Sequence, residues 1–515
     1  MGHIPRKRFL NKKRTIQYMA IFASAVFIFG LTACGEVKET AGELTAESSI
    51  EIPREDYQEI RPEGNRSNIM NPLIGGADGE AEVRRNAILK AADTLSIEGT
   101  TYYISTAGDD LNDGLTPETA FRSIDVLKWL PVKEGDAVLL ERGSIFRVTE
   151  AISAVSGVTY GAYGEGEKPC IYGSPKNYAD SSMWQPSRMK NVWKLDFGYG
   201  DAGNIVFNHG EYVGVKKLVG LNQLKNKGDF YHNEMDGILY LYCDEGNPGN
   251  QYEDIEISPL VNLFYLDVAV SGVTIDNWCF KYSGAFAVSG VQANTGITIT
   301  NCEIGYIGGS KLDLSIRYGN GIQFWNGTGD TEVRNCWIYQ IYDTALTFQG
   351  NSHKSYKNIT FSDNLLEYND MDIEIWDEGE NFTIEDLVIE NNIMRFNSKG
   401  WGTRTEDSGN RGGAACFKFK LGNCKSVTGQ IKNNVFDCPN YTAVYCITSS
   451  NGGFALTVSD NTIYANNDRG NEEVMRCGKM VDNKNPDAVK AINEVQLLQA
   501  FKTFDASPKK VQWME

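Results

Sequence analysis

A ten-residue stretch, DMDIEIWDEG, contains five carboxylates that could handle a proton or hold a cation. Ile373 and Ile375 alternate with Asp372, Glu374 and Trp376, and this period of two is typical of a β-strand with one buried face. The two acids and the indole are therefore predicted to share the outer face. Like charges that lie side by side repel each other and raise the pKa of a carboxyl group, which is what a general acid requires.

Asp343 is the nearest carboxylate on the preceding repeat of the chain. It lies two positions ahead of the level of Asp372, which places the two Cα atoms about 8 Å apart on adjacent strands. Hydrolysis of a glycosidic bond uses two carboxyl groups roughly 5–10 Å apart, one as the acid and one as the nucleophile or base. The predicted catalytic set is Asp343 with Asp372 or Glu374, and Asp370, a turn residue at the level of Asp343, is held in reserve.

An internal repeat must position these acids. An Asn or Asp behind a short alternating run recurs at Asn277, Asn301, Asn335, Asp363, Asn391, Asn433 and Asp460. The spacings are 24, 34, 28, 28, 42 and 27 residues, and each unit holds three short β-like runs with no room for a helix. Such a unit is one coil of a single-stranded right-handed parallel β-helix, in which Asn tolerates the left-handed corner. We predict this all-β solenoid, with an irregular β-sandwich as the alternative.

The opening of the repeat region carries a second signal, the segment YYISTAGDDLNDGLTPETAFRSIDVLKWLPVKEGDAVLLERGSIFR at 102–147. It resembles the opening of many bacterial β-helix carbohydrate enzymes of the pectate-lyase-like superfamily. The matching residues are Ser105, Gly108, Asp110, Asp113, Gly114, Pro117, Ala120, Gly135, Asp136 and Gly143. The resemblance covers about 102–465. It implies a β-helix and a carbohydrate substrate, and it leaves the exact reaction open.

The remaining segments complete the predicted layout. A helix from the stretch GEAEVRRNAILKAADTL suits a cap over the first coil. Residues 486–503, which begin PDAVKAINEVQLLQAF, suit a helix that packs late on the body. The predicted domains are a signal peptide (1–33), an acidic tether (34–75), the cap helix (76–101), the β-helix (102–465) with a β-rich insertion (175–262), and a C-terminal tail with its helix (466–515).

The N-terminus reads as a targeting segment. The basic run RKRFLNKKR precedes the apolar run MAIFASAVFIFGL and then LTAC, which resembles a bacterial lipobox. This resemblance implies that Cys34 is lipidated and anchors the protein on the outer face of a membrane, outside the cytoplasm. An ordinary signal peptide or a short anchor is the alternative. We expect a monomer.

Charge and composition exclude several partners. The net charge is −18, and removal of residues 1–33 leaves 43 basic against 67 acidic residues, a net charge of −24. A surface that follows nucleic-acid phosphates is not expected at that charge. The eleven cysteines include no C-x-x-C pair and several lie in strand-like runs, so we predict buried free thiols. The histidines are few and scattered, which argues against a zinc site.

One outer face of the coils combines side chains that suit a sugar. The predicted strands GIQFW, ALTFQ, DIEIW and CFKFK align into two outward rows. These rows are Gln323, Thr347, Glu374 and Lys418, and Trp325, Gln349, Trp376 and Lys420. Aromatic rings stack on the C–H faces of sugars, and amides and carboxylates bind their hydroxyl groups. We therefore predict that the residues of these rows, apart from Thr347, bind the substrate, with Glu374 placed in the catalytic set.

Two long loops precede strands of this face, at 308–320 and 397–413. Both loops should rise on the same side and form the walls of a cleft. Arg317, Trp401 and Arg404 are the side chains expected to reach into it.

Three functions remain open. In the first, which we favour, the carboxylates hydrolyse a glycosidic bond and no cofactor is required. In the second, Asp343, Asp372 and Glu374 bind Ca²⁺, and Lys418 or Arg404 removes a proton from C5 of a uronic acid, as in the β-helix polysaccharide lyases. In the third, the acids form a solvated or Ca²⁺-stabilised face of a surface protein that binds glycans without catalysis.

Overall fold

The computed structural model describes residues 69–70, 72–313, 316–413, 415–438, 442–448, 453–466, 475–481, 484–491 and 510–514. The predicted signal peptide, Cys34 and the tether up to residue 68 lie outside the described residues. Across the part that is described, no helix is long and apolar enough to cross a membrane.

Most described strands belong to three parallel sheets, each with ten strands among the described residues. Sheet A contains β1 (Thr101–Ile104), β2 (Ala137–Glu141), β5 (Thr159–Tyr163), β16 (Thr274–Asp276), β19 (Asn294–Thr300), β24 (Thr328–Arg334), β27 (Tyr356–Ser362), β30 (Thr383–Glu390), β33 (Ser426–Lys432) and β36 (Gly453–Ser459). Sheet B contains β3 (Ile145–Arg147), β6 (Cys170–Tyr172), β17 (Cys279–Lys281), β20 (Glu303–Ile307), β25 (Trp337–Ile341), β28 (Leu365–Glu367), β31 (Ile393–Arg395), β34 (Val435–Asp437), β37 (Thr462–Asn466) and β40 (Lys510–Met514). Sheet C contains β4 (Ile152–Ser153), β15 (Phe264–Leu266), β18 (Val288–Gly290), β23 (Ile322–Trp325), β26 (Thr344–Gly350), β29 (Met371–Glu380), β32 (Ala415–Asn423), β35 (Thr442–Thr448), β38 (Met475–Val481) and the antiparallel edge strand β39 (Lys484–Ala491).

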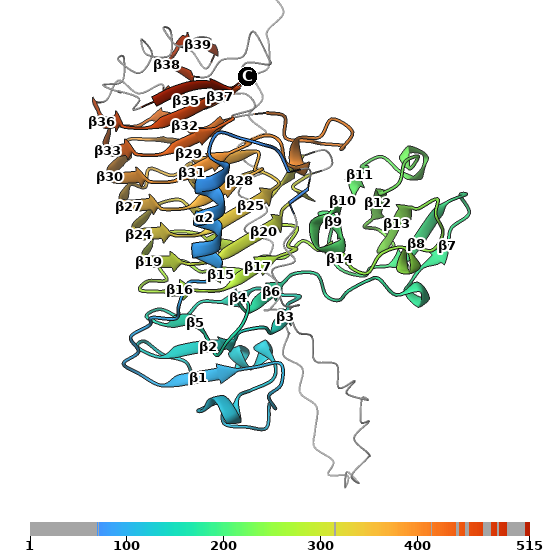
Figure 1. The fold of residues 1–515 in the computed structure, drawn as a ribbon. Helices are drawn as coiled ribbons and strands as arrows, with labels where there is room; N and C mark the ends of the chain where they lie inside the picture. The colour runs from blue at the N-terminus through green and yellow to red at the C-terminus, as the bar shows by residue number, and fades with distance from the viewer. Residues whose placement is uncertain are drawn as a thin grey trace, which may run out of the picture. The chain divides into compact units, whose positions relative to one another are not determined.

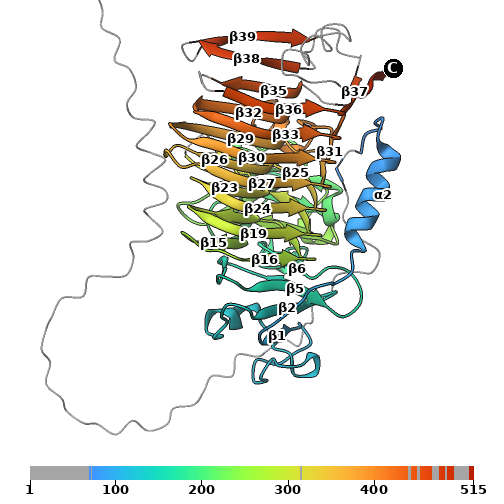
Figure 2. The same ribbon diagram turned by 90° about the vertical axis from the view of Figure 1, so that its left-hand side faces the viewer.

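The chain visits sheets A, B and C in turn and then begins the next coil, as in β24, β25 and β26 (Figures 1 and 2). This is the predicted parallel β-helix. Alternate side chains of all three sheets point inward and form one continuous apolar core, which includes Ile299, Ile338, Phe348 and Ile375.

The predicted left-handed corners lie between sheets A and B. All seven repeat residues have positive φ, from 53° at Asn335 to 60° at Asn277. A second left-handed position lies at the end of the strands of sheet B or directly after them. It is held by Tyr282, Tyr306, Gln340, Tyr368, Phe396 and Cys438, with φ from 48° to 60°. These residue types give no sequence signal for such a corner.

A ladder of buried asparagines follows the first corner. Asn364, Asn392, Asn434 and Asn461 are fully buried, and each amide in the first three donates to the next, at 2.9–3.1 Å between Nδ2 and Oδ1. Nδ2 of Asn392 also donates to the carbonyl of Phe361 at 2.8 Å. The ladder therefore joins neighbouring coils from the inside.

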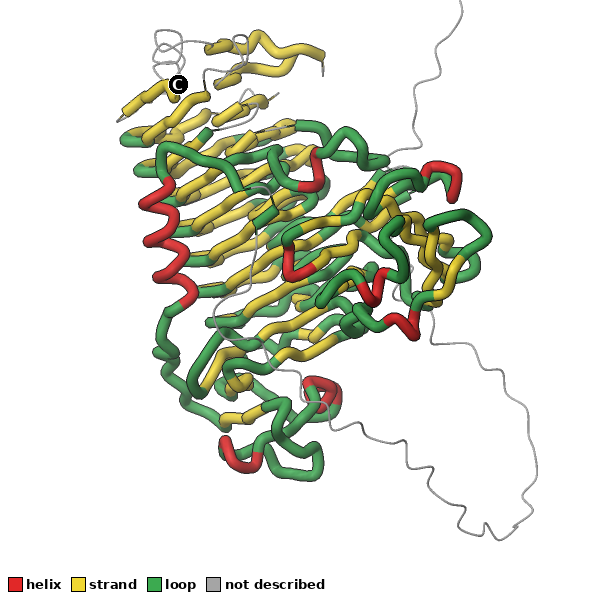
Figure 3. Tube along the Cα trace, turned by 45° about the vertical axis from the view of Figure 1, so that its right-hand side comes forward, coloured by secondary structure: helices red, strands yellow, loops and turns green. Residues whose placement is uncertain are grey.

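The predicted insertion between β6 and β15 is rich in β-structure and has its own apolar core (Figure 3). Five of its strands form one sheet, namely β11 (Val215–Lys216), β12 (Asp229–Asn233), β13 (Ile238–Tyr242), β8 (Val192–Asp196) and β7 (Gln185–Pro186). Three more form a second, namely β10 (Tyr212–Val213), β9 (Asn204–Phe207) and β14 (Ile255–Ser258).

The predicted cap helix forms but does not cover the first coil. Helix α2 (Asp78–Leu89) runs alongside the stacked strands (Figures 1 and 2) and contacts β28. Arg85 binds Glu367 at 2.7 Å, and Nη1 of Arg84 donates to the carbonyl of Asn391 at 3.1 Å. These partners lie on later coils, which explains why the helix is displaced from the first coil. Phe121, Ile124 and Val126 from the opening segment belong to the core near the first coil instead.

The prediction of a C-terminal helix is wrong for the first residues of that stretch, which form a strand. β39 covers the beginning of that stretch and pairs antiparallel with β38, with a register shift opposite Pro486. An edge strand with a bulge tolerates a proline, because the missing N–H is not needed there. Residues 492–509 lie outside the described residues. The prediction of buried free thiols is confirmed for Cys170, Cys243, Cys279, Cys302, Cys336, Cys416, Cys424 and Cys438.

The asparagine ladder generates a stability prediction. Asn392→Ala leaves Asn364 Nδ2, Asn434 Oδ1 and the Phe361 carbonyl buried without this partner, and each such group costs about 1–3 kcal/mol. We expect the free energy of unfolding to fall by about 3 kcal/mol or more in urea titration. The neighbouring Asn391→Gly keeps the left-handed corner, which glycine adopts freely, and should change stability little. Equal losses in both variants would contradict a specific role for the ladder.

Candidate active site

Sheet C has the register predicted for the outer face. Gln323 pairs with Thr347, Thr347 with Glu374, and Glu374 with Lys418. The second row runs from Trp325 through Gln349 and Trp376 to Lys420 in the same way. The two rows therefore lie side by side across four neighbouring strands.

Glu374 is held by two donors from adjacent coils. Nζ of Lys418 lies 2.5 Å from its Oε1, and Nε2 of Gln349 donates to its Oε2 at 2.8 Å. Only 5 % of Glu374 is exposed. Although burial lowers the pKa of Lys418, the charge of Glu374 outweighs it and raises that pKa above its ordinary value. The lysine is thus a cation, and both oxygens of the glutamate accept hydrogen bonds.

Asp343 lies beside this pair and binds an arginine. Nη2 of Arg411 is 2.9 Å from its Oδ2, and 7 % of Asp343 is exposed. Burial raises the pKa of Asp343, the charge of Arg411 opposes that rise, and the charge of Glu374 adds to it. The negative charge of Asp343 in turn raises the pKa of Arg411.

Asp370 stands at the level of Asp343 on the next coil, where the Asp343 carbonyl accepts from the N–H of Met371 at 3.0 Å. Its carboxyl accepts from the hydroxyl of Ser398 at 3.2 Å. Burial and the charge of Asp343 raise the pKa of Asp370 well above its ordinary value. Because two nearby buried acids cannot both ionise cheaply, ionisation of Asp343 disfavours ionisation of Asp370.

Asp372 differs from its predicted outward position. It is fully buried and accepts from the amide of Asn369 at 3.0 Å, and the pairing of β29 with β32 sets it beside Cys416, a core residue. Burial raises the pKa of Asp372 well above its ordinary value, although hydrogen bonds from Asn369 and Cys416 oppose the rise. Strict alternation fails here because the chain is still turning out of the second corner, at Tyr368, and draws Asp372 inward.

The two long loops contact each other, but Arg317, Trp401 and Arg404 do not reach the carboxylates. Arg317 is buried and binds Asp407 at 2.9 Å, and its guanidinium lies over the rings of Tyr342 and Trp401. Trp401 is fully buried and donates to the carbonyl of Gln340. The guanidinium of Arg404 binds Asp407 and backbone carbonyls of the insertion.

Arg411 is the loop residue that reaches the acids, and the sequence reasoning missed it. Its side chain is 29 % exposed, so it lies between the carboxylates and solvent. A glycine pair follows it, which the sequence offers as a weak signal of close backbone approach.

Trp325 and Trp376 form an aromatic platform on the outer face of sheet C, two residues beyond Gln323 and Glu374 on their strands. Trp325 and Trp376 stack with ring centroids 6.1 Å apart and planes 28° apart. Gln323 is nearly buried and accepts from the amide of Asn320 at 2.7 Å, while Lys420 is half-buried, with Nζ 3.8 Å from Glu378.

Of the three predicted calcium ligands, Asp372 lies in the core. Among the residues described, no group of three or more His, Cys, Asp or Glu side chains is placed to hold a metal ion.

A hollow of about 520 Å³ lies elsewhere, between α2 and sheet B. Its lining includes Glu80, Val83, Arg84, Asp363 and Asn391. The two oppositely charged groups Arg84 and Asp363 face each other at 3.9 Å. This hollow is part of the contact between α2 and the β-helix. The acids with raised pKa values and the stacked indoles lie elsewhere, on sheet C.

Among known proteins, the chain resembles solved structures in fold, and the sequence identity is low. No family model and no curated protein matches the chain. Solved structures that resemble it include a glycoside hydrolase (12 % identity, 81 % of this chain and 96 % of that one, TM-score 0.42). Others are a GH136 lacto-N-biosidase from Eubacterium ramulus (12 %, 80 % and 67 %, TM-score 0.33) and a pectate lyase (12 %, 76 % and 80 %, TM-score 0.35). The reaction of this chain must therefore be inferred from its own residues.

Proposed function

We propose that this protein is a carbohydrate-degrading enzyme, and specifically a glycoside hydrolase. The observation that carries the proposal is one face of sheet C on which Glu374, bound by Lys418 and Gln349, and the buried acids Asp343 and Asp370 lie beside stacked indoles. Glu374, with two donors on its oxygens, is the base or nucleophile. Asp343, the more exposed member of its acid pair with Asp370, is the general acid.

The reaction follows from these positions. The sugar chain stacks on Trp325 and Trp376, with the bond to be cleaved over Asp343 and Glu374. Asp343 gives its proton to the departing oxygen while Glu374 either attacks the anomeric carbon or activates a water molecule that does so. If Glu374 attacks, water then cleaves the glycosyl–Glu374 bond and gives its proton to Asp343, which restores the acid. If Glu374 activates water instead, it takes the proton of that water, and proton exchange with solvent resets both carboxyl groups.

The lyase alternative is weaker because its base must be unprotonated. Lys418 is paired with Glu374, which raises its pKa, and Arg404 is bound to Asp407 away from the acids. Both cations near the acids, Arg411 and Lys418, already have carboxylate partners. A neutral glycan therefore suits this site better than a uronic-acid polymer, which would also meet the strongly negative net charge.

Catalytic substitutions test the proposal on a panel of neutral and acidic glycans. The wild-type protein should release reducing sugar with no new absorbance near 235 nm, and EDTA should not inhibit it. Asp343→Asn and Glu374→Gln should each lower kcat at least about 100-fold with unchanged thermal stability. Asp372→Asn is the matched control, because its carboxyl is in the core, and it should stay active. New absorbance at 235 nm would establish the lyase, and glycan retention without cleavage a binding protein.

The acid assigned to Asp343 generates a pH prediction. A general acid must be protonated, so kcat/KM should fall as the pH rises through the pKa of Asp343. Arg411 lowers that pKa, and Arg411→Gln should therefore shift the basic limb of the pH profile upward by about one pH unit. Arg411→Lys keeps the charge and should leave the limb near its wild-type position. A shift of the acidic limb alone would make Asp343 the base.

The indole platform can be tested separately from the chemistry. Trp376→Ala removes one face of the stacked pair and should raise KM about 10-fold with kcat within about twofold, because the ring binds ground state and transition state alike. Trp129→Ala, an exposed indole near the first coil, is the control and should not change KM. Equal KM values for both variants would remove the platform from the binding site.

A further inference from the structure

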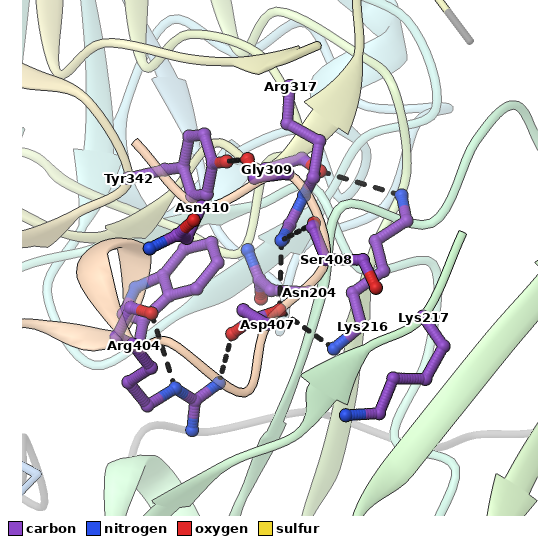
Figure 4. Close-up of polar contacts among 12 residues, drawn as sticks. Asn204, Lys216, Lys217, Gly309, Arg317, Tyr342, Arg404, Asp407, Ser408 and Asn410 are labelled. Carbon is purple, nitrogen blue, oxygen red and sulfur yellow. Dashed lines mark hydrogen bonds and ion pairs between the residues drawn. The ribbon is translucent and has the colours of Figure 1, made fainter. Parts of the chain in front are cut away.

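Asp407 joins three segments that are distant in sequence (Figure 4). Its Oδ1 accepts from the N–H of Lys216 at 2.8 Å and from Nη1 of Arg317 at 2.9 Å. Its Oδ2 accepts from Nη2 of Arg404 at 2.7 Å. Asp407 is buried, so the insertion, the loop 308–320 and the loop 397–413 meet at one carboxylate.

Further hydrogen bonds hold the same three segments together. The N–H of Ser408 donates to the carbonyl of Lys216 at 2.9 Å, and Nη2 of Arg317 donates to the carbonyl of Gly203 at 3.0 Å. Nη1 of Arg404 donates to the carbonyl of Val213 at 2.7 Å. The loop 397–413 is therefore fastened to the insertion on both sides of Asp407.

The loop that carries Asp407 also contacts Arg411 and Tyr342, which precedes Asp343. The hydroxyl of Tyr342, the neighbour of Asp343, donates to the carbonyl of Gly409, while the N–H of Arg411 donates to the carbonyl of Gly402 at 3.0 Å. Gly402 packs directly on Tyr342, since a Cβ at Gly402 would come within 2.4 Å of the Tyr342 carbonyl oxygen. Movement of the junction would thus move Arg411 relative to Asp343.

A buried cluster of charges is a poor way to gain stability, because apolar side chains of similar volume often stabilise as well or better. Its directional bonds do fix one arrangement of the loops. We propose that Asp407 is a positioning residue through which the insertion holds Arg411 against Asp343. This inference rests on the proposed function.

Asp407→Asn tests the proposal, because the two ways in which it could act have opposite signs. Loss of the Asp407 charge alone would leave the charges of Arg317 and Arg404 without their carboxylate partner. The added positive potential would lower the pKa of Asp343 and move the basic limb of the kcat/KM profile to lower pH. Release of Arg411 removes an opposing charge from Asp343, whose other charged neighbours are Asp370, Glu374 and Lys418, and moves the limb up. We expect the upward shift and a fall in kcat of about 10-fold.

A double-mutant cycle separates positioning from general loss of structure. In the Arg411→Gln background, Asp407→Asn should give no further shift of the limb, since the group that it positions is gone. Glu303→Gln breaks another buried ion pair, with Lys281 on sheet B at 2.8 Å. It should lower the thermal unfolding midpoint and leave the pH profile unchanged.

Tyr342→Phe provides a milder variant should Asp407→Asn fail to fold. It removes only the hydrogen bond to Gly409, and it should shift the limb in the same direction by a smaller amount. The positioning role alone would be overturned if Asp343→Asn is inactive and the basic limb of the pH profile is unmoved or lowered in every one of these two variants that folds. An active Asp343→Asn protein would overturn the proposed function and this inference with it.

Discussion

The left-handed corner between sheets A and B is the constraint on which the rest of the structure depends. Because Asn or Asp closes each coil at the same place, the strands that follow stack in register. A slip of one residue would move every side chain to the opposite face. The row that holds Thr347, Glu374 and Lys418 together is thus a consequence of the corners at Asn335, Asp363 and Asn391, which lie 12, 11 and 27 residues upstream of them.

The same local signals explain how much the sequence could predict. Alternation and the repeated Asn or Asp are properties of short segments, so the coils and the two rows of sheet C follow from them. Asp372 does not, because it follows the second corner, where Tyr368 has positive φ without any helpful residue type. At that corner the buried amide of Asn369 attracts the carboxyl inward. The misplaced acid is the second residue of β29, directly after this corner.

The loop arginine that contacts the acids could not be predicted from local sequence either, for a different reason. Spacing predicted that two loops would rise beside the same face, and they do meet. Which cation reaches the acids depends on contacts with residues of the insertion that are 114 and 191 positions away in the sequence. Arg317 and Arg404 form ion pairs with Asp407, and Arg411 forms an ion pair with Asp343. Such a division of three similar side chains is decided only in three dimensions.

The charges around Asp343 oppose one another in a way that suits proton transfer. Burial and the neighbouring acids raise the pKa values of Asp343 and Asp370. Arg411 and Lys418 act in the other direction. A general acid works best when its pKa lies near the working pH, because it is then protonated and still able to give the proton up. A cation held at a fixed place achieves that balance, whereas a mobile one would let the pKa vary with each movement of the loop.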